Sequence, residues 1–152
     1  MSIKIHHGAP GSYKTSGAVM DDFIPCVRSG RVVVTNVRGL TVERVRDAVY
    51  PVRFIDRLLR RNLDPVPVFP DIPESFDIIH LDTTTKADRD RLATWFHWAP
   101  PGCFFLIDEA QSVFSPRWTA KDIAALDFPG GHDAAAAAGR PATWNDECAQ
   151  PI

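Results

Sequence analysis

A lysine and a threonine near the amino terminus have the spacing of a phosphate-binding loop. Gly8, Lys14 and Thr15 match three positions of the P-loop pattern G-x-x-x-x-G-K-[ST], and Tyr13 stands where the second glycine belongs. In such a loop, backbone N–H groups and the start of the following helix hold phosphate oxygens, the lysine meets the β- and γ-phosphates, and the threonine hydroxyl binds Mg²⁺. The pattern predicts a nucleotide-phosphate site at Gly8, Ala9, Pro10, Gly11, Ser12, Tyr13, Lys14, Thr15 and Ser16.

Tyr13 is the departure from this pattern. A residue with a Cβ that is held in a left-handed backbone conformation costs about 1–2 kcal/mol relative to glycine. The loop is therefore expected to be either strained or slightly reshaped. A strand-to-helix turn with a coincidental glycine, lysine and threonine stays open as an alternative.

An acidic pair late in the chain has the character of the second half of the same site. The apolar run Cys103–Ile107 has the length of a strand and leads directly into Asp108 and Glu109. A buried strand fixes the carboxylate at its end rigidly, as a Mg²⁺·nucleotide site requires, and the next residue lies where an attacking water loses its proton. We therefore predict that Thr15 and Asp108 hold Mg²⁺ and that Lys14 and Glu109 are catalytic. A solvated strand end is the alternative for the acidic pair.

The elements that must position these residues alternate between strand and helix patterns. Strands are predicted at residues 3–7, 31–35, 76–81 and 103–107, and helices at 14–24, 41–49 and 83–96. This order predicts an α/β fold of the P-loop NTPase type, with a mostly parallel sheet, flanking helices and a site at the carboxyl ends of the strands. Pro25 is expected to end the first helix. The proline-rich stretch 64–73 excludes regular structure, and residues 129–138 are expected to be flexible.

Composition and charge narrow the class of protein. The 152 residues suit one domain, and a net charge of −2 gives no reason to expect free nucleic acid as the main partner. The three cysteines have no metal-binding spacing and suit a reducing cytosol. No apolar run approaches the roughly 20 residues of a membrane helix. The chain alone is expected to be soluble.

Arginine supplies 13 of the 17 positive charges and raises further possibilities. Arg53, Arg57 and Arg61 would form a basic stripe on a helix, with Arg60 at its edge, which could meet acidic lipid headgroups or an acidic partner. Arg38 follows the second predicted strand, and Arg117 could act as an arginine finger toward a neighbouring subunit. A solvated surface position is the simpler interpretation of each of these arginines.

Four segments together resemble a known family. They are Ile5–Thr15, Val34–Leu40, Trp98–Gly102 and Phe105–Gln111. Their joint occurrence resembles the N-terminal domain of the zonular occludens toxin family, whose members are similar to the assembly ATPases of filamentous bacteriophages. The likeness covers about residues 1–144, which we interpret as a P-loop ATPase-like domain, and residues 145–152 are predicted to be a poorly ordered tail.

The resemblance implies a domain that binds and hydrolyses ATP with Mg²⁺ at the cytoplasmic face of a bacterial inner membrane. This activity would power the assembly and extrusion of filamentous phage. The implied partners are phage coat and assembly proteins and other copies of the chain, with no direct binding of nucleic acid. Family members continue through another core strand and a membrane-spanning segment, so the chain is expected to be truncated at its carboxyl end.

Other functions stay open at this point. The toxin label belongs to a separate carboxyl-terminal part in one branch of the family, and nothing in this sequence predicts toxin activity. One alternative is a non-hydrolysing module that binds nucleotide or recruits assembly partners. Another is a small-molecule phosphotransferase, for which the proline-rich stretch 64–73 would be a poor mobile lid.

Overall fold

The computed structural model describes residues 4, 13–51, 57–59 and 64–148 of the chain. Apart from residue 4, the predicted strand at residues 3–7 lies outside this part of the chain, and so do the phosphate-loop residues 8–12. Arg53, Arg60 and Arg61 of the predicted basic stripe lie outside it as well.

Three short parallel strands form the central sheet. They are β1 (Val33–Thr35), β2 (Ile78–His80) and β3 (Phe104–Leu106), arranged in the order β2-β1-β3. Each lies within a predicted strand, and the parallel arrangement confirms that prediction. All three residues of β1 are fully buried, as expected for a β-branched central strand that is covered on both faces. Because the strands are parallel, their carboxyl ends share one edge of the sheet.

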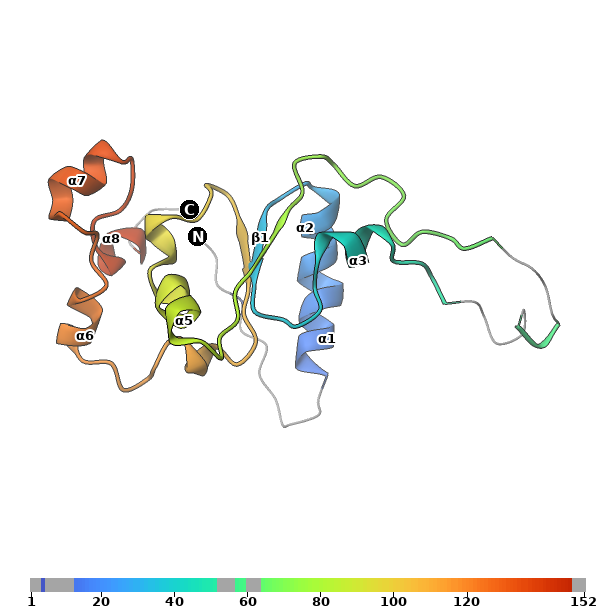
Figure 1. The fold of residues 1–152 in the computed structure, drawn as a ribbon, viewed down its shortest axis with the longest axis horizontal. Coiled ribbons are helices and arrows are strands. Elements are labelled where there is room, and N and C mark those ends of the chain that lie inside the picture. The colour runs from blue at the N-terminus through green and yellow to red at the C-terminus, as the bar shows by residue number, and fades with distance from the viewer. Residues whose placement is uncertain (1–3, 5–12, 52–56, 60–63, 149–152) are drawn as a thin grey trace.

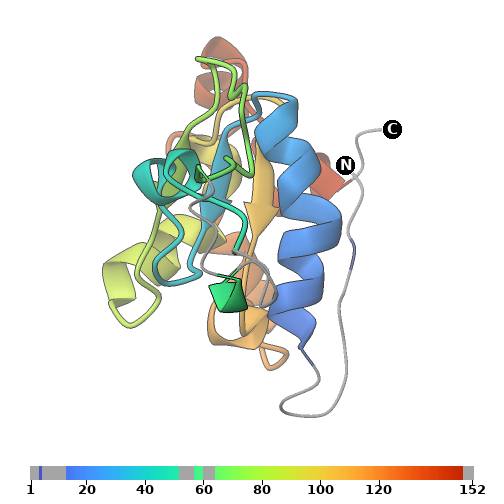
Figure 2. The same ribbon diagram turned by 90° about the vertical axis from the view of Figure 1, so that its right-hand side faces the viewer.

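The core consists of two hydrophobic clusters, one on each face of the sheet. Val33 belongs to the cluster that contains Phe23 and Val27, whereas Val34 belongs to the cluster that contains Leu92. This division follows from the strand period of two, which points successive side chains to opposite faces. Figure 2 accordingly shows the helices that begin at residue 14 on one side of the sheet and the helix that begins at residue 86 on the other.

The first helical segment runs without a break past Pro25. It comprises α1 (Lys14–Ala18), a π-helical turn η1 (Val19–Phe23) and α2 (Ile24–Arg28), which stand in one column in Figure 1. The prediction that Pro25 ends this helix is wrong. A π-helical turn shifts the hydrogen-bond register, so a proline directly after it costs less than one inside a regular α-helix.

Threonine caps begin several of the later helices. Thr41 caps α3 (Val42–Arg46), because its hydroxyl accepts a hydrogen bond from the Arg44 N–H at 3.3 Å. Thr85 caps α5 (Lys86–Ala93) in the same way through the Asp88 N–H at 3.2 Å, within the helix predicted at residues 83–96. The remaining helices are η2 (Trp95–His97), η3 (Ala110–Ser112), α6 (Ala120–Ala124), α7 (Gly131–Ala137) and α8 (Trp144–Cys148).

Two further predictions about these segments are corrected. The helix after Thr41 ends at Arg46, and Val49 instead forms an isolated antiparallel bridge with Pro67. The tract 129–138, expected to be flexible, contains helix α7. Its alanine run explains the helix, because alanine has the highest intrinsic helix propensity.

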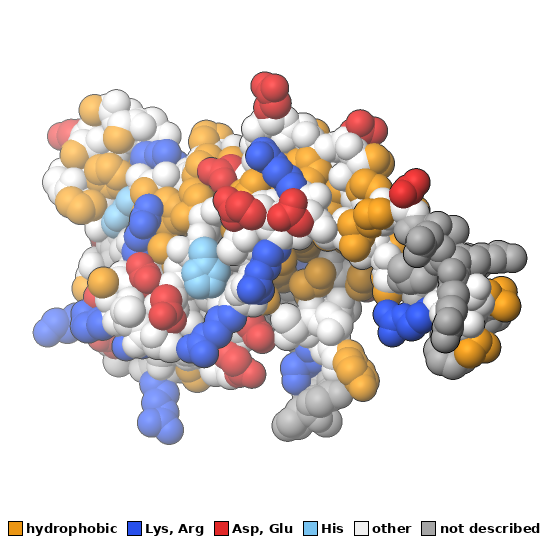
Figure 3. Space-filling view, turned by 45° about the vertical axis from the view of Figure 1, so that its right-hand side comes forward, with side chains coloured by type: hydrophobic (Ala, Val, Ile, Leu, Met, Phe, Trp, Pro, Cys, Tyr) orange, Lys and Arg blue, Asp and Glu red, His pale blue; other side chains and the backbone are white. Residues whose placement is uncertain are grey.

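The chain around the Val49–Pro67 bridge leaves the body of the domain as an arm (Figure 1). The proline-rich stretch 64–73 contains no helix or strand, as predicted. Large exposed hydrophobic side chains gather on this arm, as Figure 3 shows, and they are Val49, Tyr50, Leu58, Leu59 and Val66.

Candidate functional site

The side chains of Thr15 and Asp108 meet although 93 residues separate them in sequence. Thr15 Oγ1 donates a hydrogen bond to Asp108 Oδ2 at 3.2 Å, in partly buried surroundings. Thr15 lies in the first turn of α1, and Asp108 follows β3 by two residues. The fold therefore places the start of this helix beside the carboxyl end of the sheet, which is the edge where open α/β sheets bind their ligands.

Tyr13 adopts the backbone conformation that the missing glycine would take. Its φ of 57° and ψ of 28° are left-handed, and its carbonyl accepts a hydrogen bond from the Gly17 N–H at 2.8 Å. Its side chain is 81% exposed. The chain therefore keeps a glycine-like turn at this position and accepts strain there.

Glu109 is strained in the same way on the opposite side of the contact. Its φ is 50° and its ψ is 51°, and its backbone N–H donates to Asp108 Oδ1 at 3.0 Å. Its exposed carboxylate accepts a hydrogen bond from Gln111 Nε2. Among the described residues, Tyr13 and Glu109 are the two non-glycine residues with positive φ. Both flank the Thr15–Asp108 contact, and strained backbone of this kind concentrates at functional sites.

Asn36 is a site residue that sequence reasoning missed. It follows β1, and its side-chain amide pairs with the backbone of Asp108, with Nδ2 donating to the Asp108 carbonyl at 2.8 Å and Oδ1 accepting from the Asp108 N–H at 2.7 Å. Nδ2 also donates to Thr83 Oγ1 at 3.2 Å. A polar residue directly after a buried strand is the signal that could have found it.

Thr35 closes the end of the sheet beneath this network. Its hydroxyl is fully buried, donates to the Leu106 carbonyl at 2.8 Å and accepts from the Val37 N–H at 3.1 Å. A buried hydroxyl with both kinds of partner carries no unsatisfied group into the core. Thr35 therefore fixes the ends of β1 and β3 relative to each other.

Asp82, beside this edge of the sheet, has a carboxyl group whose pKa is lowered. Hydrogen bonds from Thr84, first from its backbone N–H, lower the pKa of the Asp82 carboxyl, and the nearby positive charge of Arg38 lowers this pKa further. Arg38 itself is exposed. The flank therefore presents an ionised carboxylate and a guanidinium to solvent.

The predicted site residues divide into three groups. Gly8, Ala9, Pro10, Gly11 and Ser12 lie outside the described residues. Lys14, Thr15 and Asp108 are partly buried, whereas Tyr13, Ser16 and Glu109 are exposed. The fold brings the two described halves of the predicted site together through Thr15 and Asp108, and the chemical roles stay predictions.

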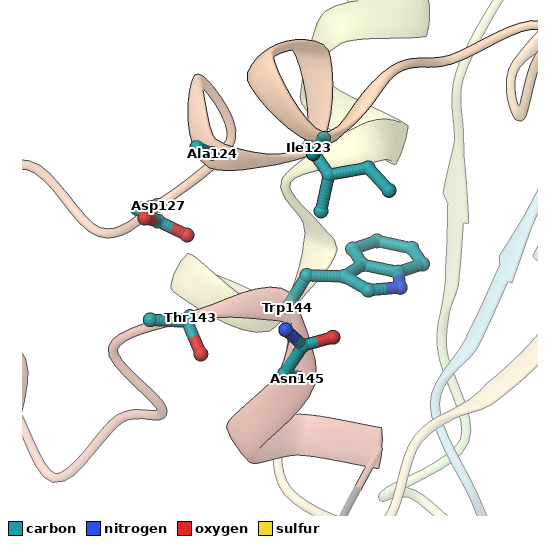
Figure 4. A pocket seen from close by; sticks show the side chains of 7 residues that line it. Ile123, Ala124, Asp127, Thr143, Trp144 and Asn145 are labelled. Atoms are coloured by element: carbon teal, nitrogen blue, oxygen red, sulfur yellow. The ribbon is translucent and has the colours of Figure 1, made fainter.

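Two hollows lie elsewhere on the domain. One of about 210 Å³ lies between α6 and α8, where Ile123 and Trp144 form much of the wall shown in Figure 4 and Asp127 is the ionisable residue. The other, of about 580 Å³, lies between α5 and α6. Neither hollow is lined by a predicted site residue. The candidate site is instead marked by the hydrogen bonds among Thr15, Asp108 and Asn36 at the carboxyl edge of the sheet.

The described residues hold no preformed cluster of metal ligands. No group of three or more histidine, cysteine, aspartate or glutamate side chains among them could hold a metal ion. Magnesium sites for nucleotides commonly use one or two protein ligands and leave the other positions to phosphates and water. The Thr15–Asp108 pair presents a hydroxyl and a carboxylate oxygen, and its role in binding a metal stays a prediction.

Comparison with known proteins establishes the family. The sequence model described as Zonular occludens toxin (Zot) matches residues 2–134. This chain belongs to the zonular occludens toxin family. A curated relative, the Zona occludens toxin of Vibrio cholerae serotype O1 (strain ATCC 39315 / El Tor Inaba N16961), is 39% identical over 129 residues. The resemblance seen in the four sequence segments is thereby confirmed.

The similarity covers most of this chain but only part of the Vibrio protein. The match spans 85% of this chain and 27% of the Vibrio protein, so the chain spans about a quarter of the length of this family member. No solved structure matches the chain. In the part of the chain that the structure describes, no helix is both long and apolar enough to cross a membrane.

Proposed function

We propose that this zonular occludens toxin family domain binds ATP with Mg²⁺ at the carboxyl edge of its sheet and hydrolyses it. The hydrogen bond between Thr15 and Asp108 carries the proposal. It joins a threonine that opens a helix to an aspartate that ends a buried strand, and these are the two positions from which P-loop enzymes hold Mg²⁺. A coincidental lysine and threonine in a turn would not need an aspartate 93 residues away.

The donor atoms of this pair suit magnesium. Mg²⁺ prefers oxygen ligands, and Thr15 and Asp108 offer a hydroxyl and a carboxylate. Thr15 directs its hydroxyl proton to Asp108, so the lone pairs of its hydroxyl oxygen stay available for a cation. When bound, the ion would neutralise charge on the β- and γ-phosphates.

Lys14 and the backbone at Tyr13 would hold the phosphates. Lys14 begins α1, directly before Thr15, so its ammonium group is attached at the mouth of the same site. The left-handed turn at Tyr13 gives the chain the direction that a motif glycine would give it. These two residues would therefore place positive charge and backbone N–H groups near the phosphates.

Glu109 would orient and deprotonate the attacking water. Glu109 follows Asp108 directly in the chain, and its backbone N–H donates to Asp108 Oδ1, which fixes the backbone beside the carboxylate that faces Thr15. Its own carboxylate is exposed and contacts Gln111, so it would turn from Gln111 toward the water when nucleotide is present. A general base of this kind contributes about 10²–10⁴-fold to the rate.

We further propose that hydrolysis powers the assembly and extrusion of filamentous phage at the bacterial inner membrane. Membership of the family supports this part of the proposal. Phage coat and assembly proteins and other copies of the chain are the proposed partners. Membrane attachment would come from a different part of the family's proteins.

The test is Mg²⁺-dependent ATP turnover by the purified chain and by Glu109→Gln, with nucleotide affinity measured in parallel. We expect the variant to retain affinity within about twofold and to lose turnover about 10²-fold or more. Asp127→Asn, which changes a carboxylate in the hollow between α6 and α8, is the matched control and should keep both activities. Equal background rates in all three proteins would contradict hydrolysis.

The contact between Glu109 and Gln111 favours a second candidate function. If Glu109 stays engaged with Gln111, the domain would bind nucleotide without hydrolysing it and would serve as a nucleotide-dependent interaction module. In that case the wild type would bind ATP with ordinary Mg²⁺ dependence and show only background turnover, and Gln111→Ala, which releases Glu109, would raise turnover. Turnover that stays at background in Gln111→Ala would show that this contact is not what keeps Glu109 from acting.

A further inference from the structure

The amide of Asn36 extends the pairing of β1 with β3 beyond the last residues of the strands. In the register of the sheet, Thr35 lies opposite Leu106, and β3 then continues toward Asp108. The Asn36 side chain donates to the Asp108 carbonyl at 2.8 Å and accepts from the Asp108 N–H at 2.7 Å, as a strand backbone would. The backbone of Asp108 is therefore held by a side chain after the ladder of the sheet has ended.

We propose that Asn36 is the positioning residue for Asp108 and that its bond to Thr83 ties the β2–α5 loop to the magnesium side of the site. This inference deepens the proposed function and rests on it. The Asn36 amide bonds to the Asp108 backbone and to the Thr83 hydroxyl, so it acts on the metal-binding side chains through the Asp108 backbone. It is therefore assigned a positioning role and no catalytic one.

Few other side chains could replace this amide. Pairing with both polar groups of one residue needs a donor and an acceptor side by side, and only the carboxamides of asparagine and glutamine supply them. Glutamine is one methylene longer, so its amide would overshoot the distances of 2.7 and 2.8 Å. Aspartate would present a second acceptor to the Asp108 carbonyl, which is repulsive.

The fixed backbone sets the direction of the Asp108 carboxylate. With its N–H and carbonyl both occupied by Asn36, Asp108 directs Oδ2 to Thr15 and Oδ1 to the Glu109 N–H. Without the amide, this residue would lie past the end of β3 with a freer backbone. The carboxylate would then lose the preorganisation that supporting residues around a metal site provide.

The second N–H of the amide reaches a different part of the chain. Nδ2 donates to Thr83 Oγ1 at 3.2 Å, and the Thr83 carbonyl accepts from Arg89 Nη1 of α5 at 2.7 Å. Asn36 thus joins the loops that follow all three strands. A change in the position of Asp108 on ligand binding would be transmitted to the start of α5 through this bond.

The test is a fluorescent ATP-analogue titration of Mg²⁺ with the wild type, Asn36→Ala, Thr83→Val and Asn145→Ala. Nucleotide affinity is first measured in EDTA. Mg²⁺ is then added, and the concentration that produces half of the Mg²⁺-dependent increase in affinity is called the half-effect concentration. For Asn36→Ala we expect unchanged affinity in EDTA and a half-effect concentration raised about 10–100-fold. Thr83→Val should raise it about twofold to fivefold. Asn145→Ala, at the hollow between α6 and α8, should not change it.

The outcomes separate this inference from the function on which it rests. A wild type that binds nucleotide with Mg²⁺ dependence, together with an equal half-effect concentration in Asn36→Ala, would overturn the positioning role and leave the proposed function intact. An equal loss of affinity in EDTA and in Mg²⁺ would also overturn it, because that result indicates a general structural role. A wild type that binds no nucleotide would overturn both. If Asn36→Ala does not fold, Asn36→Ser, which can make one of the two bonds, is expected to give an intermediate shift.

Discussion

The carboxyl edge of the sheet is formed by polar side chains from distant segments, whereas the hollow between α6 and α8 is formed largely by apolar side chains from one segment. At the edge, Thr15, Asn36, Thr83 and Asp108 come from distant parts of the chain and contact one another through hydrogen bonds. The hollow is lined by residues 120–145, in which Trp144 and Ile123 contribute apolar surface. The edge therefore depends on the fold for its chemistry, whereas the hollow is a by-product of packing between neighbouring helices.

A concave surface alone does not locate the chemistry of this domain. The hollow offers one carboxylate, Asp127, without a partner group of opposite charge in its lining. The edge offers a hydroxyl bonded to a carboxylate and an amide bonded to the backbone of the same aspartate, together with two strained residues on its flanks. We therefore expect substitutions at the hollow to affect stability and substitutions at the edge to affect ligand binding.

The largest effect is expected from Trp144→Ala, at the hollow. The Trp144 ring packs against Trp95, Phe96 and Phe114 at centroid distances of 6.5, 5.9 and 5.7 Å. Its loss should reduce the free energy of unfolding by about 3 kcal/mol, measured by urea denaturation. Affinity for Mg²⁺·ATP should change less than twofold at a temperature where the variant is folded. A folded variant that had lost nucleotide binding would contradict the expectation that the hollow affects stability alone.

A smaller effect, but a functional one, is expected from Thr15→Val. Valine has nearly the shape of threonine and lacks the hydroxyl that donates to Asp108. The Mg²⁺-dependent part of ATP affinity should fall about 10–100-fold, which corresponds to about 1.4–2.8 kcal/mol. Titration calorimetry with and without Mg²⁺ measures this part directly. Thr143→Val, at the hollow, is the control: it removes the hydroxyl that accepts from the Asp146 N–H at 3.1 Å at the start of α8, so it should lower stability but leave the Mg²⁺-dependent affinity as in the wild type.

Tyr13→Gly should stabilise the domain. Because Tyr13 has a φ of 57°, glycine would remove left-handed strain of about 1 kcal/mol, part of which is offset by the greater freedom of glycine in the unfolded chain. Tyr50→Gly removes an exposed tyrosine that does not have positive φ, and it should not stabilise. Thermal unfolding of the two variants separates strain relief from the loss of a surface aromatic. An equal change in the unfolding temperature of both variants would show that Tyr13 is not strained.

The smallest expected effect is a pH dependence at His97, away from the edge. Burial lowers the pKa of His97 below its ordinary value of 6.5, and within the described part of the chain its Nε2 is buried without a hydrogen-bond partner. As the pH is lowered, His97 therefore becomes protonated at a higher pH in the unfolded chain than in the folded protein. Stability should be constant above about pH 6.5 and should fall as the pH drops below that value. Urea midpoints at pH 7.5 and 5.5 should differ less in His97→Phe than in the wild type. An unchanged difference would contradict the assignment.

Much of the fold could be predicted from the sequence because its signals are local. The run of valines at β1, the apolar run at β3 and the caps at Thr41 and Thr85 are each specified within a few residues. The break expected at Pro25 was wrong because a π-helical turn precedes the proline, and no local pattern announces such a turn.

The site was predictable only in part. Lys14, Thr15, Asp108 and Glu109 stand in recognisable motifs, and the contact between two of them follows once the parallel sheet is assumed. Asn36 lies within the family segment Val34–Leu40, but that segment assigns it no chemical role, because its role depends on a partner 72 residues away whose backbone must end a strand at the right register. The left-handed conformation of Glu109 is likewise set by its surroundings and cannot be deduced from the residue type.

The central claim is that the amine at the start of α1 and the carboxylate after β3 serve one bound triphosphate. Calorimetric titration of Mg²⁺·ATP into the wild type and Lys14→Ala tests it most directly. The account predicts measurable binding by the wild type and affinity at least about tenfold weaker in the variant, because one charge-assisted contact to phosphate is lost. Equal affinities in two folded proteins, or no binding by the wild type, would contradict it.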